Sequence, residues 1–364
     1  MLEEGKIGNR EAKTLVLIFI ITQLFLTIMA QLAEKGQTGT WIIFLVATIV
    51  AGVLFLPLAA LMERYPGESI IEVGRELTGP YFNSLFSFFY IINFLFLAAL
   101  TLRQYAERVL TVSTPDLPVS IAMGVMLGGA LLGCHLGLEA MARSSLFIIY
   151  FIGFTVLLVS LLTYPYWRFD YLFPLAGPGV LKLIKEGFFR SSLMSGVLLL
   201  AIIFPSLKET KIQRIGLDAI ATGGLMFTLA TVASLMTFEA SVLQEMSLPS
   251  YEMSRLIYFG RFLQRLESIF MPTWALVGMM QVAIGIYCGS VIITRTLQVP
   301  YHRPFLLPVS IITYALAFLA ENVSQTLWVD FYLLKFYGWI PAFLFPALLF
   351  VLDRRKKKEE RKKE

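Results

Sequence analysis

The chain has 364 residues, of which 57% are hydrophobic and 15% are charged, and its formal net charge is +5. Soluble domains carry about 45–50% apolar and about 25% charged residues, so this composition excludes an ordinary water-soluble protein. Apolar runs long enough to cross a bilayer as helices recur along the chain, and such continuous runs exclude the alternating strands of a membrane barrel. The composition therefore predicts an all-α integral membrane protein.

We expect about ten transmembrane helices within a single transmembrane domain. The expected spans are residues 14–33, 41–62, 81–102, 118–137, 145–164, 189–206, 216–240, 269–293, 305–322 and 335–352. The two longest loops, 165–188 and 241–268, are expected to be partly structured. Eight Lys and Arg residues lie in the tail 353–364. Because the span count is even and basic residues favour the cytoplasmic side, both termini are expected there.

The second long loop carries an apolar face at helical spacing. Leu256, Phe259, Leu263, Leu266 and Phe270 recur at intervals of three and four, with polar residues between them. This spacing predicts an amphipathic helix that lies in the membrane interface or caps the bundle. Covering the ends of the spans is the favoured role, and a direct contact with a ligand is the alternative.

The sequence contains no pattern typical of catalysis or metal binding. His135 and His302 lie near span ends without acidic or cysteine neighbours, and Cys134 and Cys288 lie in apolar segments without metal-type spacing. We therefore expect no enzymatic activity, no metal and no cofactor. A basic cluster directly after a span favours contact with lipid headgroups over nucleic acid.

Polar residues inside spans are the most informative signal, because each must pair or face a cavity. They gather in the first, third, sixth and eighth spans: Thr22, Gln23 and Thr27; Tyr90 and Asn93; Ser191, Ser192, Ser195 and Gly196; Gln281, Gly285, Tyr287 and Ser290. A single such residue is often only an interhelical hydrogen bond. However, the first and sixth spans are five spans apart in chain order, and so are the third and eighth. This spacing is typical of two inverted repeats of five spans each, here 14–164 and 189–352.

Inverted-repeat transporters bind their ligands near the bilayer midplane, where interrupted helices expose backbone amides and carbonyls. Ser195-Gly196 is the better candidate for such an interruption, because glycine tolerates irregular backbone and serine offers a donor. The first span has no glycine or proline before Gly36, which argues against a break there. Near the span ends, Arg103 and Glu107 are one helical turn apart and are expected to pair at the membrane interface.

Several segments resemble one family. These are Arg261–Ser268 followed by Phe270 and Trp274, Trp41 at the start of the second span, the turn Tyr65–Ser69, Phe204-Pro205 followed by Lys208 and Lys211, and the basic tail. With these features the chain resembles the B subunits of bacterial spore germinant receptors. The likeness runs over nearly the whole chain.

The resemblance implies membership of the amino acid–polyamine–organocation transporter superfamily, with its five-plus-five inverted repeat. It implies a small-molecule germinant, often an amino acid, bound within the bundle, and action with A-type and C-type subunits in the spore inner membrane. The implied ligand-binding residues are Thr22, Gln23, Asn93, Ser195, Gly196, Gln281 and Tyr287. Two features depart from the family: Thr22-Gln23-Leu24 replaces a glycine-containing break, and residues 198–200 lack the usual acidic residue.

Three functions remain in competition. The leading hypothesis is a receptor subunit in which germinant binding shifts a conformational equilibrium. The alternative is an ion-coupled amino acid symporter or exchanger, which sustained accumulation in proteoliposomes would distinguish. The third is a structural subunit with a vestigial pocket, which would bind its partners but no ligand.

Overall fold

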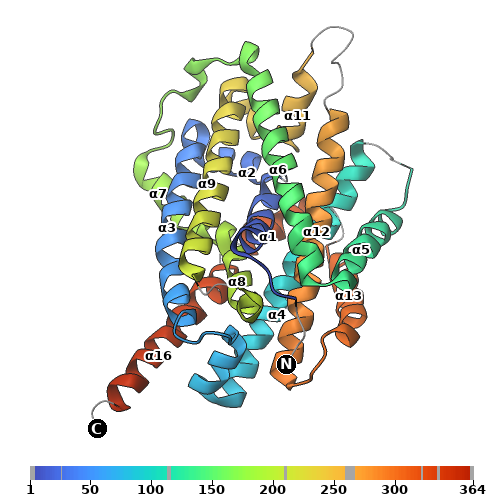
Figure 1. The fold of residues 1–364 in the computed structure, drawn as a ribbon. Helices are drawn as coiled ribbons and strands as arrows, with labels where there is room; N and C mark the ends of the chain where they lie inside the picture. Colours follow the sequence, from blue (N-terminus) through green and yellow to red (C-terminus); the bar gives the residue numbers. More distant parts are fainter. Residues whose placement is uncertain are drawn as a thin grey trace.

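The computed structural model describes residues 5–25, 27–112, 116–208, 211–258, 267–320, 323–333 and 337–360. These residues form a helical bundle (Figure 1). Its first half contains α1 (Asn9–Ile21), η1 (Thr22–Phe25), α2 (Ile28–Gly36), η2 (Gln37–Gly39), α3 (Thr40–Met62), α4 (Ile70–Val112), α5 (Val119–Leu136) and α6 (Leu138–Leu162). Its second half contains η3 (Tyr164–Tyr166), η4 (Phe169–Leu172), α7 (Val180–Arg190), η5 (Ser191–Val197), α8 (Leu198–Ile203), η6 (Phe204–Ser206), α9 (Ile212–Thr237), α10 (Ala240–Leu243), α11 (Pro249–Leu256), α12 (Glu267–Leu297), α13 (Arg303–Ala317), α14 (Val323–Trp328), η7 (Val329–Leu333), η8 (Ile340–Leu344) and α16 (Phe345–Glu360).

The prediction of an all-helical membrane protein is confirmed. Within the described residues, seven helical stretches are long and apolar enough to cross a membrane. The three remaining expected spans fall short of that length for visible reasons. The first is divided among α1, η1 and α2, the ninth is the 15-residue helix α13, and the tenth contains the π-helical segment η8, with the π-helical η7 just before its expected start. About ten helical crossings therefore fit the fold.

The centre of the bundle is occupied by α1 and α8, which are buried on all sides. Nine residues of α1 are buried, and so is every residue of α8. A helix that is apolar all round is stable only when other helices enclose it. In contrast, α5 and α6 expose large apolar side chains such as Leu132, Phe147, Tyr150 and Phe154. This exposure is typical of helices that face lipid.

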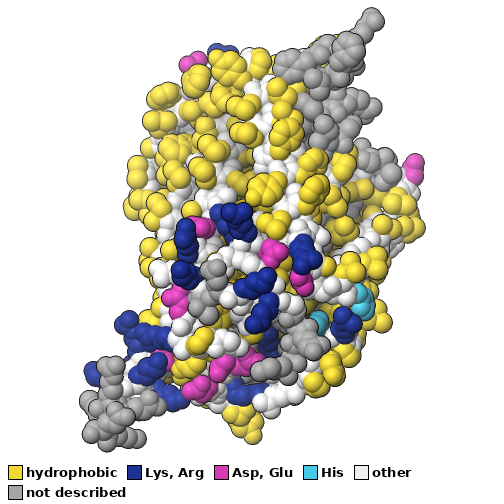
Figure 2. Space-filling view, in the orientation of Figure 1, with side chains coloured by type: hydrophobic (Ala, Val, Ile, Leu, Met, Phe, Trp, Pro, Cys, Tyr) yellow, Lys and Arg dark blue, Asp and Glu magenta, His cyan; other side chains and the backbone are white. Residues whose placement is uncertain are grey.

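Both termini lie at the same end of the bundle, which we call the terminal end (Figure 1). Lys and Arg side chains gather toward this end on the face shown in Figure 2, below a broad apolar surface. The N-terminal segment also pairs with the chain after the sixth span. The backbone amide of Ile7 donates to the carbonyl of Ser206 over 2.9 Å, and that of Lys208 donates to the carbonyl of Ile7 over 3.0 Å. This pairing ties the entry of α1 to the exit of α8.

Two expectations at the span ends have different outcomes. The predicted pair forms, because Arg103 Nε lies 2.6 Å from Glu107 Oε1. Packing within the bundle buries both side chains, and their expected place at the membrane interface stays a prediction. The predicted amphipathic helix, by contrast, falls largely outside the described residues: α11 ends at Leu256 and α12 begins at Glu267, while 259–266 are not described.

Candidate functional site

The first span is interrupted although it contains no glycine or proline at the break. α1 ends at Ile21, a 3₁₀ turn follows as η1, and α2 begins at Ile28. The Thr22 hydroxyl donates to the carbonyl of Ile18 over 2.7 Å. A threonine hydroxyl that bonds four residues back competes with the helical ladder and often bends the helix. The absence of glycine was therefore a poor argument against a break here.

The sixth span is interrupted where the sequence predicted, at Ser195-Gly196. Residues Ser191–Val197 form the 3₁₀ segment η5 between α7 and α8. The Ser191 hydroxyl donates to the Phe188 carbonyl over 2.7 Å, which fits the tighter winding of a 3₁₀ turn. A Cβ added to Gly196 would lie 2.8 Å from Phe19 Cδ1. Glycine therefore permits the broken sixth span to pack directly against α1.

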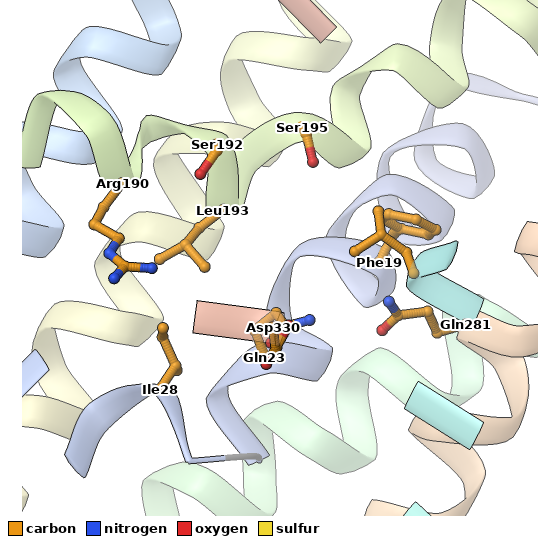
Figure 3. A pocket seen from close by; sticks show the side chains of 10 residues that line it. Phe19, Gln23, Ile28, Arg190, Ser192, Leu193, Ser195, Gln281 and Asp330 are labelled. Carbon is orange, nitrogen blue, oxygen red and sulfur yellow. The ribbon is translucent and has the colours of Figure 1, made fainter. Parts of the chain in front are cut away.

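A cavity lies between the two interrupted spans, and five spans contribute to it (Figure 3). Its lining is Phe19, Gln23 and Ile28 of the first span, Leu97 of α4, Arg190, Ser192, Leu193 and Ser195 of the sixth, Gln281 of α12 and Asp330 of η7. The space between these atoms amounts to about 410 Å³, but only about 20 Å³ is open to the centre of a water molecule. One water needs roughly 10–15 Å³ by that measure, so a larger ligand must displace side chains.

Four of the lining side chains carry polar atoms without a hydrogen-bond partner in the described structure. These atoms are Gln23 Oε1, both amide atoms of Gln281, Arg190 Nε and Nη2, and Asp330 Oδ1. All four residues are at most 6% exposed. Buried polar groups are nearly always satisfied by protein or by water, because an unmade hydrogen bond costs about 1–3 kcal/mol. Several unpartnered polar atoms thus face one cavity, where a polar molecule could pair with them.

The seven residues expected to bind the ligand divide into two groups. Gln23, Ser195 and Gln281 line the cavity. The other four, Thr22, Asn93, Gly196 and Tyr287, are buried or packed nearby but do not line it. Thr22 and Gly196 shape the two breaks, as described above. The ring of Tyr287 makes an edge-on contact with His302, with ring centroids 5.3 Å apart.

Two charged residues of the cavity, Arg190 and Asp330, were not among the expected ligand-binding residues. Arg190 directly precedes the serine-rich segment, and Asp330 fell between the expected ninth and tenth spans. In the structure Arg190 ends α7, Asp330 belongs to η7, and both side chains are buried. The available signal was an isolated acidic residue in the apolar stretch 327–333. Charges within a membrane bundle mark functional sites more often than neutral polar residues do.

No metal centre is indicated in the part of the chain that the structure describes. Those residues contain no group of three or more His, Cys, Asp and Glu side chains that could hold a metal ion. The charged groups of the cavity are one arginine and one aspartate. The lining therefore presents one positive and one negative group to the same space.

Comparison with known proteins agrees with this geometry. Among solved structures, MhsT in complex with L-phenylalanine has a TM-score of 0.67 at 10% identity, covering 96% of this chain and 89% of that chain. A mutant of the Eremococcus coleocola manganese transporter has a TM-score of 0.62 at 12% identity, covering 93% and 76%. At these identities the likeness concerns the fold alone, which is that of membrane transporters.

Sequence relatives are more specific. Spore germination protein KB of Bacillus subtilis is 25% identical over 99% of this chain and 98% of its own length. Spore germination protein YndE of the same organism is 24% identical over 98% of this chain and 99% of its own length. The family model described as "Spore germination protein" matches residues 6–326. The chain therefore belongs to the spore germination protein family.

Proposed function

We propose that this protein is a membrane subunit of a spore germinant receptor that binds a small polar germinant, an amino acid, in the cavity between its first and sixth spans. The observation that carries the proposal is the set of buried, unpartnered polar atoms on Gln23, Gln281, Arg190 and Asp330. Membership of the spore germination family supports a role in germination. The likeness in fold to MhsT, whose structure holds L-phenylalanine, supports an amino acid as ligand.

The narrowness of the cavity suggests how binding becomes a signal. The cavity has room for only about one water molecule. An amino acid therefore fits only after the side chain of Leu193 or Phe19, or the interrupted segments η1 and η5, move. A ligand shifts a conformational equilibrium by its differential affinity for the two states. Ligand binding would thus favour a more open arrangement of η1 and η5, and partner subunits would respond to that change.

The proposal includes the setting in which the subunit works. We expect A-type and C-type receptor subunits as partners, the spore inner membrane as location, and both termini on the cytoplasmic side. The even number of expected spans and the basic residues near the terminal end support this orientation. Co-purification of tagged protein from spores, with identification of the bound subunits, tests the partnership.

The transporter-like fold supports a second candidate, an ion-coupled amino acid symporter or exchanger. A flux assay in proteoliposomes separates the two functions. A receptor is expected to bind amino acids at equilibrium without accumulating them. Sustained uptake against a gradient would favour the symporter.

The experiment that tests the proposed site replaces Ser195 with leucine. Ser195 lines the cavity, and added side-chain volume there competes with the ligand. Overpacking a tight site costs about 1–3 kcal/mol, so Ser195→Leu should raise the germinant concentration for half-maximal response by about 5- to 150-fold. The matched control is Ser84→Leu on the exposed face of α4. An unchanged response of the Ser195 variant at equal protein level would contradict the placement of the pocket.

A further inference from the structure

Arg190 and Asp330 approach the same cavity from two different spans. Arg190 ends α7 in the sixth span, and Asp330 lies in η7 of the tenth. Figure 3 shows both among the lining side chains, with Gln23 and Gln281 beside the same space. Their charges are opposite, yet they form no ion pair with each other in the described structure. In the described structure each charge is therefore buried without an ion pair, although Arg190 donates to the Phe331 carbonyl and Asp330 interacts with Gln104.

The guanidinium of Arg190 is held by Phe331, the neighbour of Asp330. Arg190 Nη1 donates to the carbonyl oxygen of Phe331 over 3.0 Å, and its Cζ lies 3.6 Å from the centroid of the Phe331 ring. This contact fixes the plane of the group and uses one side of it. The two donors left without partners are Nε and Nη2. These adjacent N–H groups form the fork that binds both oxygens of a carboxylate.

Asp330 offers the complementary group. Its side chain is 3% exposed and interacts with Gln104, while Oδ1 accepts no hydrogen bond of normal geometry in the described structure. A carboxylate oxygen only accepts hydrogen bonds, and an ammonium group only donates them. Phe19 packs close to Gly196 in the sixth-span break. The side chains of Arg190 and Asp330 line the cavity and are available to bind the charged ends of a ligand.

We propose that Arg190 and Asp330 recognise the ligand as a zwitterion, with Arg190 binding its carboxylate and Asp330 its ammonium group. This inference rests on the proposed function, since it identifies the groups that select an amino acid in that cavity. The remaining lining, Phe19, Ile28, Leu97 and Leu193, is apolar and favours an aliphatic side chain. A ligand of this class neutralises both buried charges at once, whereas a sugar or a simple anion leaves at least one of them unpaired.

The test uses purified protein in lipid nanodiscs and three probes that share one carbon skeleton. L-leucine carries both charged ends, isocaproate lacks the amine, and isoamylamine lacks the carboxylate. Wild-type protein should bind L-leucine about 10- to 100-fold more tightly than either analogue, because each analogue leaves one buried charge unpaired. Arg190→Gln should reduce the preference for L-leucine over isoamylamine to within about threefold. Asp330→Asn should reduce the preference over isocaproate in the same way.

This pattern separates recognition from a merely structural role. A variant that only distorts the cavity weakens all three probes alike and leaves their ratios unchanged, which would overturn the inference. Arg190→Lys retains the charge and should keep more of the preference over isoamylamine than Arg190→Gln does. The control is Arg143→Gln, which removes an exposed arginine paired with Glu139 outside the cavity and should leave all ratios unchanged. Melting temperatures confirm that each variant is folded.

The outcomes also separate this inference from the proposed function. If wild-type protein binds L-leucine and the neutralising variants bind all probes as it does, the charge assignment fails and the proposed function stands. If Arg190→Gln and Asp330→Asn change the association and dissociation rates of L-leucine by the same factor, its affinity is unchanged. The two residues then control access to the cavity, and the assignment also fails. If wild-type protein binds none of the twenty amino acids while it remains folded, both proposals fail.

Discussion

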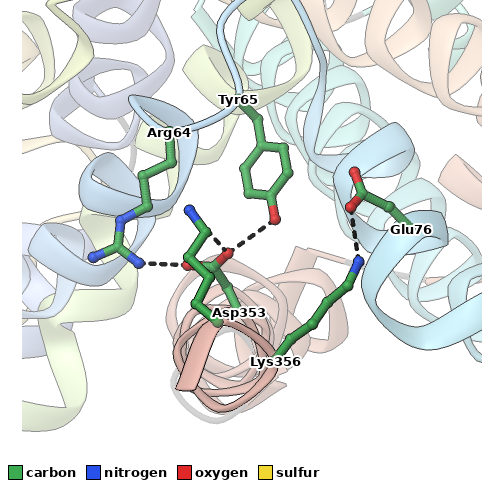
Figure 4. A network of polar contacts seen from close by, with 6 residues as sticks. Arg64, Tyr65, Glu76, Asp353 and Lys356 are labelled. Carbon is green, nitrogen blue, oxygen red and sulfur yellow. Dashed lines mark hydrogen bonds and ion pairs between the residues drawn. The ribbon is translucent and has the colours of Figure 1, made fainter. Parts of the chain in front are cut away.

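Among the described residues, charged and polar side chains occur both in the cavity and at the terminal end, but they are paired with one another only at the terminal end. In the cavity, Arg190, Asp330 and Gln281 are buried with unpartnered polar atoms. At the terminal end, a terminal cluster of Arg64, Tyr65, Glu76, Asp353 and Lys356 joins α16 to the α3–α4 turn and the start of α4 (Figure 4). There the charges are paired with one another.

The terminal cluster centres on Asp353, whose side chain is 1% exposed. Arg64 forms an ion pair with Asp353 Oδ2, the Tyr65 hydroxyl donates to Oδ1 over 2.9 Å, and Lys356 Nζ lies 2.9 Å from Glu76 Oε1. Paired charges hold two segments together, whereas unpaired buried charges cost stability unless a ligand binds. From this comparison we expect the terminal cluster to stabilise the fold, and we propose that the cavity residues serve binding at the expense of stability.

The largest stability effect is expected at the terminal cluster. Asp353→Asn removes the charge that binds Arg64 and keeps the shape, so the free energy of unfolding should fall by about 2 kcal/mol. The melting temperature should decrease in nanodiscs, while L-leucine affinity stays within about twofold of wild type. A loss of ligand affinity equal to that of Ser195→Leu would contradict the division between the two regions.

The stability that Asp353 contributes is expected to depend on pH. Burial alone would raise the pKa of Asp353, but hydrogen bonds from Tyr65 and Arg64 and the charge of Lys357 outweigh it and lower the pKa. A lowered carboxyl pKa adds stability that is present above the unfolded value of about 3.9 and is lost as pH falls through the folded value. The difference in melting temperature between wild type and Asp353→Asn should therefore be full at pH 7 and decrease as the pH falls below the unfolded value of about 3.9. A difference that does not decrease below that pH would refute the assignment.

In the cavity, by contrast, a substitution is expected to raise the stability of the fold. Gln281→Met keeps the side-chain volume and removes two unpartnered amide atoms, so stability should rise by about 1 kcal/mol. Ligand affinity should fall severalfold, because one hydrogen-bonding group is lost. Thermal melting measures the change in stability, and equilibrium binding measures the change in ligand affinity. Destabilisation by this variant would show that Gln281 is a structural residue.

The smallest effect is expected at the exposed edge of the terminal cluster. Lys356 and Glu76 have side chains about half exposed, at 45% and 46%. Exposed ion pairs contribute about 0.2–1 kcal/mol, so Lys356→Gln should lower stability by about 0.5 kcal/mol. Added salt should reduce the difference further. A loss as large as that of Asp353→Asn would mean that burial does not determine the strength of this cluster.

The sequence predicted the architecture well because bilayer thickness imposes long apolar runs. The second span, expected at 41–62, is α3 at Thr40–Met62, and the break at Ser195-Gly196 lies within η5. The break in the first span was missed because Thr22 bends the helix through its own hydroxyl, without glycine or proline. Whether a hydroxyl bonds the backbone or a neighbouring helix depends on packing, which local sequence does not specify.

The site was only partly predictable for a related reason. Gln23, Ser195 and Gln281 were identified because polar residues inside apolar runs are conspicuous. Arg190 lies at the start of the expected sixth span and Asp330 in the expected loop before the tenth, where charges normally face water or headgroups. Only the packing of the interrupted tenth span against α7 carries them into the bundle. That contact joins residues more than a hundred positions apart, and no local pattern indicates it.

The central claim is that an amino acid occupies the cavity between the interrupted first and sixth spans. Equilibrium binding of L-leucine to wild type, Ser195→Leu and Ser84→Leu in nanodiscs tests it most directly. The account predicts saturable binding to wild type and Ser84→Leu, weakened by about 5- to 150-fold in Ser195→Leu. Equal binding to all three proteins would place the ligand elsewhere and contradict the account.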